Sequence, residues 1–135
     1  MVFIEWVESY SVNIKEIDDQ HKKLIGILNR AHDAMKAGKG KKAISTLLSE
    51  LIDYTGYHFR TEEDLFQKYG YPDLIKHKEE HDDLTQKALD LKTSFDEGRL
   101  MNNIEIIIFL KDWLNTHILD TDKKYSAFLN SKGVE

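Results

Sequence analysis

The chain has 135 residues, which is the size of one ordinary domain and enough to bury a hydrophobic core. It contains no cysteine, so disulfide scaffolds, thiolate zinc sites and cysteine nucleophiles are excluded, and a reducing compartment is expected. The net charge of -5, with acidic and basic residues mixed along the chain, argues against nucleic acid as a partner.

Targeting and membrane signals are also missing from the sequence. Residues 1–6 do not combine a basic segment with an apolar run, so no signal peptide is expected. The longest apolar run, Ile106 to Leu110, is far shorter than the roughly 20 residues that span a bilayer. The basic cluster at residues 39–42 has no aromatic neighbours and is interpreted as a solvated loop. We therefore expect a soluble, cytoplasmic protein without a membrane partner.

The chain is predicted to begin with an arm, followed by a first helix. Residues 1–17 have no sustained hydrophobic period, which indicates an arm over the core, anchored by Trp6. The first helix is predicted at about 18–37, with Asp18 or Asp19 as its N-cap. Its buried stripe combines one histidine with four apolar residues: His21, Leu24, Leu28, Ala31 and Met35.

The second helix is predicted at about 41–69. Its buried stripe includes a histidine and a glutamate: Ile44, Leu48, Leu51, Thr55, His58, Glu62 and Phe66. Gly56 lies in the middle of this helix, where glycine costs about 1 kcal/mol relative to alanine, so a closely packed neighbour is expected there. Gly70 suits a left-handed cap, and Pro72 suits the first turn of the next helix.

Two more long helices complete the predicted fold. The third, at about 72–97, has two histidines in its stripe: Leu74, His77, His81, Leu84, Ala88, Leu91 and Phe95. The fourth, at about 102–121, has a stripe of Ile106, Leu110, Trp113 and His117. A short tail helix is predicted at about 123–131. Four long helices with short connections predict an all-α, up-down-up-down four-helix bundle, and one domain over residues 1–135.

Five of the six histidines lie on these buried stripes: His21, His58, His77, His81 and His117. A single buried histidine is usually a core residue satisfied by a hydrogen bond. Five imidazoles and a carboxylate without partners would be costly to bury, and a shared cation is the simplest way to satisfy them. In an alternating bundle these residues all fall at one end. His32 does not, and we expect it at the surface or in a second layer.

The number of candidate ligands indicates more than one metal ion. Tetrahedral zinc takes four ligands, whereas two six-coordinate metals with bridging carboxylates would use the whole set. The Glu-x-x-His motif of ferritin-like di-iron bundles is absent. Helical spacing favours Glu62 as a ligand and places Glu63 towards solvent. For the second carboxylate the spacing is ambiguous, because Asp120 and Asp122 lie about 60° and about 140° from His117 on a regular helix.

Four motifs in order along the chain carry a resemblance to a known family: Asp18–His21, His58–Glu63, His77–His81 and Trp113–Asp122. On these motifs, which span almost the whole chain, the sequence resembles the hemerythrins, and in particular the single-domain bacterial hemerythrins. The resemblance implies two iron ions with a bridging oxo or hydroxo group. One iron would bind His77, His81 and His117, the other His21 and His58, with Glu62 and Asp122 bridging the two.

The resemblance also implies which aspartate is a ligand and what the centre binds. It selects Asp122 as the second carboxylate ligand. We therefore expect either that the helix is distorted in this region or that Asp122 reaches the metals from a different angle than His117. The resemblance implies an open position on the two-histidine iron, at which the family binds dioxygen reversibly. A dioxygen pocket should be apolar and dry. Five apolar neighbours of the candidate ligands can line it, although they can equally be ordinary core residues: Leu24, Phe59, Trp113, Leu114 and Ile118.

Three functions are compatible with such a site. The one that the resemblance favours is a non-enzymatic protein that stores, transports or senses dioxygen. The alternative is a di-iron enzyme that reduces peroxide or nitric oxide, which apolar pocket walls without an obvious proton donor disfavour. The third is a structural metal bundle, for example with zinc.

Overall fold

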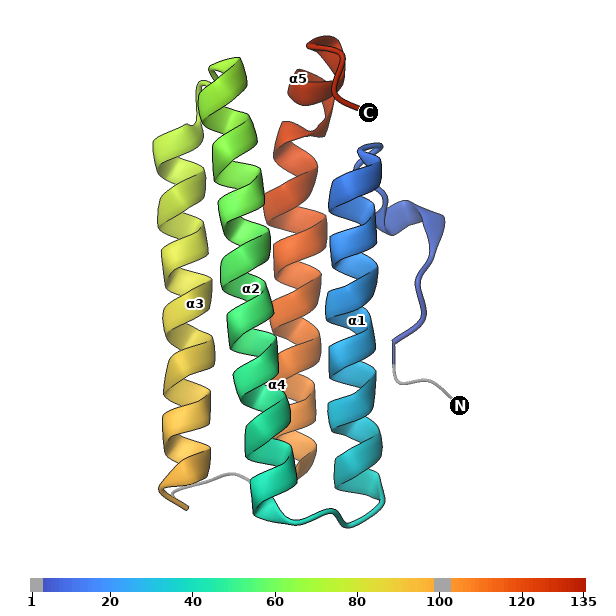
Figure 1. Ribbon diagram of the computed structural model, residues 1–135, viewed down its shortest axis with the longest axis vertical. Coiled ribbons are helices and arrows are strands. Elements are labelled where there is room, and N and C mark those ends of the chain that lie inside the picture. The colour runs from blue at the N-terminus through green and yellow to red at the C-terminus, as the bar shows by residue number, and fades with distance from the viewer. Residues whose placement is uncertain (1–3, 99–102) are drawn as a thin grey trace.

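The computed structural model describes residues 4–98 and 103–135, with the backbone alone at 103, 104, 107 and 119–121. Four long helices run alternately up and down and form the predicted all-α bundle: α1 (Lys15–Lys36), α2 (Lys41–Tyr69), α3 (Leu74–Asp96) and α4 (Asn103–Asn115) (Figure 1). Helix α1 packs against α2 and α4, and α3 packs against α2. Within the described residues, no helix is long and apolar enough to cross a membrane.

The chain changes helix type after α4. A π-helical segment, η2 (Thr116–Thr121), continues α4, and a 3-10 segment, η3 (Asp122–Tyr125), leads into the short α5 (Ser126–Ser131). The predicted fourth helix at 102–121 is therefore a regular α-helix only as far as Asn115, because its last six residues are π-helical, and its predicted first residue lies outside the described residues. The predicted tail helix is shorter than expected, because its first residues belong to η3.

Helix α1 begins at Lys15, three residues before the predicted start. Neither predicted N-cap acts as one. Asp18 instead accepts hydrogen bonds from the Ser11 hydroxyl at 2.5 Å and from the Val12 backbone N–H at 2.9 Å, and Asp19 pairs with Lys15 at 2.8 Å. The prediction is wrong because Asp18 binds donors of the arm rather than those of its own helix.

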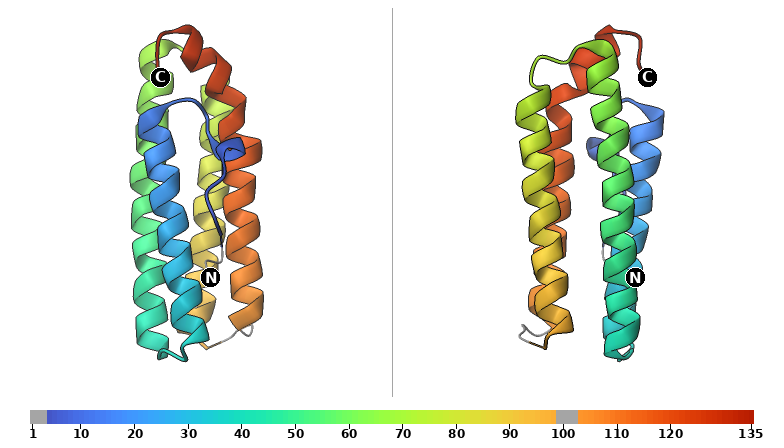
Figure 2. Two further views of the ribbon diagram at one scale, coloured as in Figure 1. Left: turned by 90° about the vertical axis from the view of Figure 1, so that its right-hand side faces the viewer. Right: turned by 60° about the vertical axis from the view of Figure 1, so that its left-hand side comes forward.

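The arm lies along the outside of the bundle, beside α1 and α4 (Figure 2). The backbone N–H and C=O of Ile4 each form a hydrogen bond with the side chain of Asn29, at 2.8 and 2.9 Å. Trp6 packs against the hydrophobic core, with its ring 5.8 Å from that of Tyr10 and 5.0 Å below the ammonium group of Lys22. Trp6 thus anchors the arm as predicted, and Asn29 fixes its backbone.

The turn between α2 and α3 follows the prediction at Gly70, which adopts the left-handed conformation with φ of 70°. Its backbone N–H donates to the carbonyl of Phe66. Helix α3 begins at Leu74 rather than at Pro72, because residues 71–73 form a turn in which the Leu74 N–H donates to the Tyr71 carbonyl at 3.3 Å. At Gly56 the expected close neighbour is not found: within the described part of the chain nothing packs within 4 Å of the position of an alanine Cβ.

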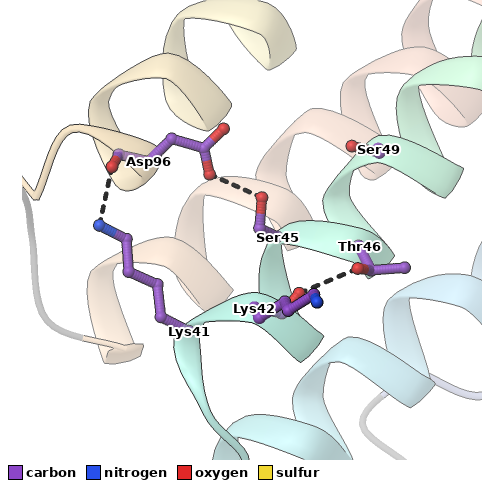
Figure 3. A pocket seen from close by; sticks show the side chains of 6 residues that line it. All are labelled: Lys41, Lys42, Ser45, Thr46, Ser49 and Asp96. Carbon is purple, nitrogen blue, oxygen red and sulfur yellow. Dashed lines mark hydrogen bonds between the residues drawn. The ribbon is translucent and has the colours of Figure 1, made fainter.

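The far end of the bundle, where α2 begins and α3 ends, is held by exposed polar contacts (Figure 3). Lys41 donates to the carbonyl oxygen of Asp96 at 2.7 Å, and the Ser45 hydroxyl donates to its carboxylate at 2.6 Å. We call these three residues the distal clasp. They line a groove of about 450 Å³ together with Lys42, Thr46 and Ser49.

Two hydrophobic clusters fill the interior. The main core runs along the bundle and consists of Ile4, Leu24, Ile25, Ile27, Leu28, Met35, Ile44, Leu48, Leu51, Phe59, Leu84, Leu91, Ile106, Leu110, Trp113, Leu114 and Ile118. The end core closes the end at which α2 meets α3 and consists of Val12, Ile14, Ile17, Phe66, Tyr71, Tyr125 and Leu129. The buried polar residues described next contact aromatic rings of both clusters.

Candidate metal centre

A layer of buried polar side chains lies between the main core and the end core. None of its seven members is more than 2% exposed: His21, His58, Glu62, His77, His81, His117 and Asp122. We call them the polar cluster. They come from the start of α1, the end of α2, the start of α3 and the segments after α4, which all meet at the upper end of the bundle in Figure 1. The structure thus brings together the seven residues that the sequence singled out as ligands.

Helical spacing positions two pairs within this cluster. His58 and Glu62 are four residues apart on α2, so they lie on the same face one turn apart, and Nε2 of His58 is 2.5 Å from Oε1 of Glu62. His77 and His81 are four apart on α3, with ring centroids 4.5 Å apart and rings nearly perpendicular. Each helix therefore presents two donor groups towards the same point.

The carboxylate of Glu62 lies between two sets of imidazoles and presents a different oxygen to each. Oε1 is 2.5 Å from Nε2 of His58 and 3.7 Å from Nε2 of His117. Oε2 is 3.5 Å from Nε2 of His77 and 3.8 Å from Nε2 of His81. This carboxylate therefore has the position that a group bridging two cations requires.

Asp122 divides its oxygens in the same way. Oδ2 is 2.6 Å from Nε2 of His21 and 3.0 Å from Nε2 of His117, and it lies 3.3 Å from His58. Oδ1 faces the other side and is 3.4 Å from Nε2 of His77. Two carboxylates thus connect the same two sets of imidazoles.

The π-helical segment explains how Asp122 reaches the cluster. On a regular α-helix Asp122 would point about 140° away from His117. In a π-helix, backbone hydrogen bonds join residues five apart, and the N–H of Asp122 donates to the carbonyl of His117. The wider turn brings both side chains to one face, which is the local distortion expected for Asp122. The side chain of Asp120, the competing candidate, lies outside the described residues.

The donor atoms form two groups, and within each group they lie within 4.8 Å of one another. One group contains His21, His58, His117 and both carboxylates, and the other contains His77, His81 and both carboxylates. His117 therefore lies with His21 and His58, and its Nε2 is 2.8 Å from that of His58. The resemblance instead assigns His117 to the iron of His77 and His81.

The polar cluster has the chemistry of a metal site. Nε2 of His58 lies 3.0 Å from that of His21 and 2.8 Å from that of His117. Nitrogen ligands about 2.1 Å from one metal ion and at right angles lie about 3 Å apart. Several cluster atoms have no hydrogen-bond partner among the described residues: both oxygens of Glu62, Oδ1 of Asp122, and Nε2 of His77 and His81. Such buried atoms are costly unless a cation satisfies them, and imidazoles with carboxylates suit iron.

Two imidazoles of the cluster have raised pKa values. Burial lowers the pKa of His58, but the charge of Glu62 and a hydrogen bond with Asp122 outweigh it and raise the pKa to about 9. Burial also opposes protonation of His77, but the anionic carboxylates of Asp122 and Glu62, whose oxygens lie 3.4 and 3.5 Å from its Nε2, again raise its pKa to about 9. Both are therefore protonated at neutral pH without metal. A metal ion binds the neutral imidazole, so metal binding releases these protons.

The other pKa shifts in the cluster keep two imidazoles neutral and both carboxylates anionic. Burial lowers the pKa of His81 to about 4 and also lowers the pKa of His21. Burial opposes the ionisation of Glu62 and Asp122, but interactions with the neighbouring histidines outweigh it, so both carboxyl pKa values lie below their ordinary range. Anionic carboxylates and neutral imidazoles are the forms that bind cations.

Three residues that the sequence did not single out also contact the cluster. Glu63, expected towards solvent, accepts a hydrogen bond from Nδ1 of His81 at 2.9 Å. The predicted orientation of Glu63 towards solvent is therefore wrong. Its side chain points away from the buried stripe of α2, but α3 packs against that side of the helix. Gln20 accepts a hydrogen bond from Nδ1 of His58 at 2.6 Å. In the sequence the only signal for Gln20 was its place in the motif ending at His21.

The third residue is Tyr125, which is completely buried in the end core. Its ring lies 5.4 Å from that of His77. Burial, and then the charges of Asp122 and Glu62, raise its pKa well above the ordinary value. Its hydroxyl has no hydrogen-bond partner of good geometry in the described structure. A protonated phenol is thus present beside the cluster, on the side of the end core.

The five apolar residues predicted to line a pocket are all buried in the main core, beside the cluster: Leu24, Phe59, Trp113, Leu114 and Ile118. Phe59 stacks on His81 with ring centroids 3.9 Å apart, and Trp113 stacks on His117 at 6.1 Å. The indole N–H of Trp113 donates to the carbonyl of Leu84 at 2.9 Å, which fixes this ring. His32 is partly exposed and belongs to neither group of donor atoms.

The comparisons with known proteins agree with this site. A family described as the hemerythrin HHE cation binding domain matches residues 12–129. A bacteriohemerythrin of Methylococcus capsulatus is 36% identical over 132 residues, which are 97% of this chain and 100% of that protein. A hemerythrin-like protein of Naegleria gruberi is 40% identical over 124 residues, 92% of each chain. A solved structure of wild-type hemerythrin is 37% identical, with a TM-score of 0.84 over 94% of this chain and 98% of that chain.

Proposed function

The chain belongs to the hemerythrin HHE cation-binding family, and from this premise we propose that it binds dioxygen reversibly at a non-haem di-iron centre. The observation that carries the proposal is the division of carboxylate oxygens between two sets of imidazoles. Oε1 of Glu62 and Oδ2 of Asp122 face one set, whereas Oε2 and Oδ1 face the other. A cation held by one set of imidazoles faces only one oxygen of each carboxylate, so the arrangement supports a second cation at the other set.

The proposed ligands are the seven members of the polar cluster. Five imidazoles divide unequally between two metals, so one metal receives three and the other two. This holds whether His117 joins His77 and His81, as the resemblance implies, or stays with His21 and His58, as the distances favour. One metal therefore keeps an open position. Two ferrous ions with a bridging oxo or hydroxo group can supply the electrons for reversible binding of dioxygen there.

The surroundings of the cluster support binding rather than turnover. Phe59 and Trp113 cover imidazoles on the side of the main core, and their neighbours Leu24, Leu114 and Ile118 are also buried. Apolar walls keep water and protons away from a bound oxygen molecule. They thereby slow the reaction in which the bound oxygen is protonated and released and the metal is left oxidised. We accordingly propose a non-enzymatic, cytoplasmic protein whose partner is dioxygen.

Spectroscopy of the iron-loaded protein tests this proposal. We expect about two irons per chain, as the two groups of donor atoms require. An anaerobic ferrous sample should develop visible absorption bands when exposed to air, and the bands should disappear under vacuum. Irreversible oxidation to the ferric form without a distinct oxygenated spectrum would contradict dioxygen binding. Fewer irons per chain would favour a structural metal bundle.

One observation favours a second function, the reduction of peroxide or nitric oxide. Tyr125 provides a buried, protonated hydroxyl beside the cluster, where the sequence offered no obvious proton donor. Steady turnover of either substrate with an external reductant, lost in Tyr125→Phe while the iron content is kept, would establish this role. If no turnover occurs, or if Tyr125→Phe is as active as the wild type, Tyr125 does not act as a proton donor.

A further inference from the structure

Two histidines of the polar cluster form a hydrogen bond through Nδ1, the ring nitrogen that faces away from the cluster. Their two partners differ in charge. Nδ1 of His81 donates to the carboxylate of Glu63 at 2.9 Å. Nδ1 of His58 donates to the side-chain oxygen of Gln20 at 2.6 Å. With Nδ1 protonated, Nε2 of each neutral ring presents its lone pair to the cluster. Both contacts therefore select the tautomer that binds a metal.

The orientation of the Gln20 amide is fixed by a further pair of hydrogen bonds. The Thr61 hydroxyl donates to the backbone carbonyl of Tyr57 at 3.2 Å. Its oxygen is then free to accept, and Nε2 of Gln20 donates to it at 3.2 Å. The amide oxygen must consequently face His58, and an amide oxygen can only accept. Gln20 is 5% exposed, so water competes little for this contact.

Glu63, which lies on α2, contacts His81 on the neighbouring helix α3. Its side chain is 23% exposed and lines a surface groove of about 410 Å³ with Asp64, Lys78 and Asp82. The carboxylate thus touches solvent on one side and a buried imidazole on the other. A carboxylate that accepts a hydrogen bond from a ligating imidazole orients the ring and makes it a stronger electron donor to the metal, and a neutral amide does so less.

We propose that Glu63 and Gln20 are positioning residues that make the two metals of this centre electronically unequal. The anionic partner of His81 favours the ferric state of the metal that this ring binds, whereas the neutral partner of His58 leaves its metal easier to keep ferrous. The inference rests on the proposed di-iron centre. According to this inference, the redox difference between the two irons arises from the charge of the residues that form hydrogen bonds with their histidine ligands, as well as from the number of those ligands.

Three nearly isosteric substitutions test this inference. Glu63→Gln removes the charge but keeps an oxygen that can accept from His81. Gln20→Glu adds a charge beside His58. Asp64→Asn is the matched control, because Asp64 is exposed and lines the same groove as Glu63 without contacting an imidazole in the described structure. The readouts are the iron content and the midpoint potentials of the iron-loaded proteins, measured by anaerobic spectroelectrochemistry.

We expect Glu63→Gln to raise the midpoint potential of the iron that His81 binds, and Gln20→Glu to lower that of the iron that His58 binds. Asp64→Asn should leave the potentials of both irons near the wild-type values. Glu63→Ala, which also removes the hydrogen bond, should lower iron affinity by roughly 10- to 100-fold in a chelator competition. A shift in Glu63→Gln no larger than that in Asp64→Asn would overturn the inference, as would shifts of the same sign in the first two variants. If Gln20→Glu does not fold, the comparison of Glu63→Gln with Asp64→Asn decides alone.

The outcome is separable from that of the proposed function. Wild-type protein that binds two irons but oxidises irreversibly contradicts dioxygen binding and still allows the potentials to be compared. Reversible oxygenation of the wild type together with unshifted potentials in Glu63→Gln contradicts only the inference about charge. Wild-type protein that binds no pair of irons contradicts both.

Discussion

The two ends of the bundle hold their helices together by opposite means. At the distal clasp, Lys41 and Ser45 contact Asp96 at the exposed surface, where water competes for the same groups and weakens such contacts. At the other end the polar cluster has almost no exposure, and its carboxylates face imidazoles of the cluster rather than water. The same types of interaction are thus weak at one end and decisive at the other, because burial removes the competing water.

Removal of a proposed ligand should give the largest contrast between the ends. His77→Ala and His117→Ala each take away a buried nitrogen that faces both carboxylates, so we expect both variants to lose iron. His32→Ala, on the same bundle but outside the cluster, should keep the wild-type content. Iron analysis of the purified proteins provides the measurement. Wild-type iron content in His77→Ala and His117→Ala would show that the cluster does not hold the metal, and equal loss of iron in all three variants would show that position along the bundle does not identify the ligands.

Removal of the metal should destabilise the cluster end selectively. A ligand present at about 1,000 times its dissociation constant stabilises a protein by about 4 kcal/mol, and the unpartnered cluster atoms lose their cation in the metal-free form. We therefore expect a lower melting temperature and faster amide exchange at the cluster end than at the distal clasp. Matching melting temperatures with and without iron would contradict a stabilising metal.

The pH dependence of the metal-free protein should sharpen this contrast. The folded-state pKa values of His58 and His77 are about 9, above the unfolded value of about 6.5. Their contribution to stability is complete below about pH 6.5 and is lost as the pH rises through about 9. The lowered pKa values of His21 and His81 act only below about pH 6.5.

Urea unfolding of metal-free protein at pH 6.5 and pH 9 measures this loss, and we expect the lower free energy of unfolding at pH 9. The iron-loaded protein should not lose stability in this range, because protons no longer compete for its imidazoles. Metal-free protein that is as stable at pH 9 as at pH 6.5 would show that His58 and His77 are not protonated when folded.

Between the two ends, Gly56→Ala should stabilise the protein. The glycine is helical, and nothing in the described residues packs within 4 Å of the added methyl group. Alanine should therefore raise the free energy of unfolding by about 0.5–1 kcal/mol through its helix propensity and the smaller entropy of the unfolded chain. Chemical denaturation measures this. Destabilisation would indicate that the site is more tightly packed than the structure describes.

The smallest effect is expected at the distal clasp. Ser45→Ala removes an exposed hydrogen bond to Asp96, which also pairs with Lys92 at 2.6 Å. We expect a smaller change in the free energy of unfolding than for any substitution above, because water replaces the lost hydrogen bond, and unchanged iron content. A loss as large as that caused by metal removal would mean that burial does not explain the difference between the two ends.

Local properties of the chain explain which features were predictable. The stripes of α2 and α3 follow a helical period, and this period identified His58, His77 and His81 as buried without any knowledge of their neighbours. Alternating helix direction then brought the ends of α2 and α4 to the starts of α1 and α3. The left-handed cap at Gly70 was predictable because it depends on one residue.

The contacts that the sequence missed depend on two elements at once. Asp18 follows an N-cap pattern, but its partners Ser11 and Val12 are set by the path of the arm. Glu63 points away from the stripe of α2, and only the packing of α3 brings His81 to it. Tyr125 reaches the cluster because it packs in the end core with Phe66 of α2 and Tyr71 of the turn before α3.

By itself, the sequence determined that this chain folds as a four-helix bundle with five of its six histidines buried at one end, because hydrophobic period and helix direction are local and additive. Tertiary structure decided how the donor atoms meet. The π-helical segment turns Asp122 towards His117, and the carboxylates of Asp122 and Glu62 divide their oxygens between two sets of imidazoles. These distances depend on the relative rotation of neighbouring helices, which packing sets and no single stripe of residues encodes.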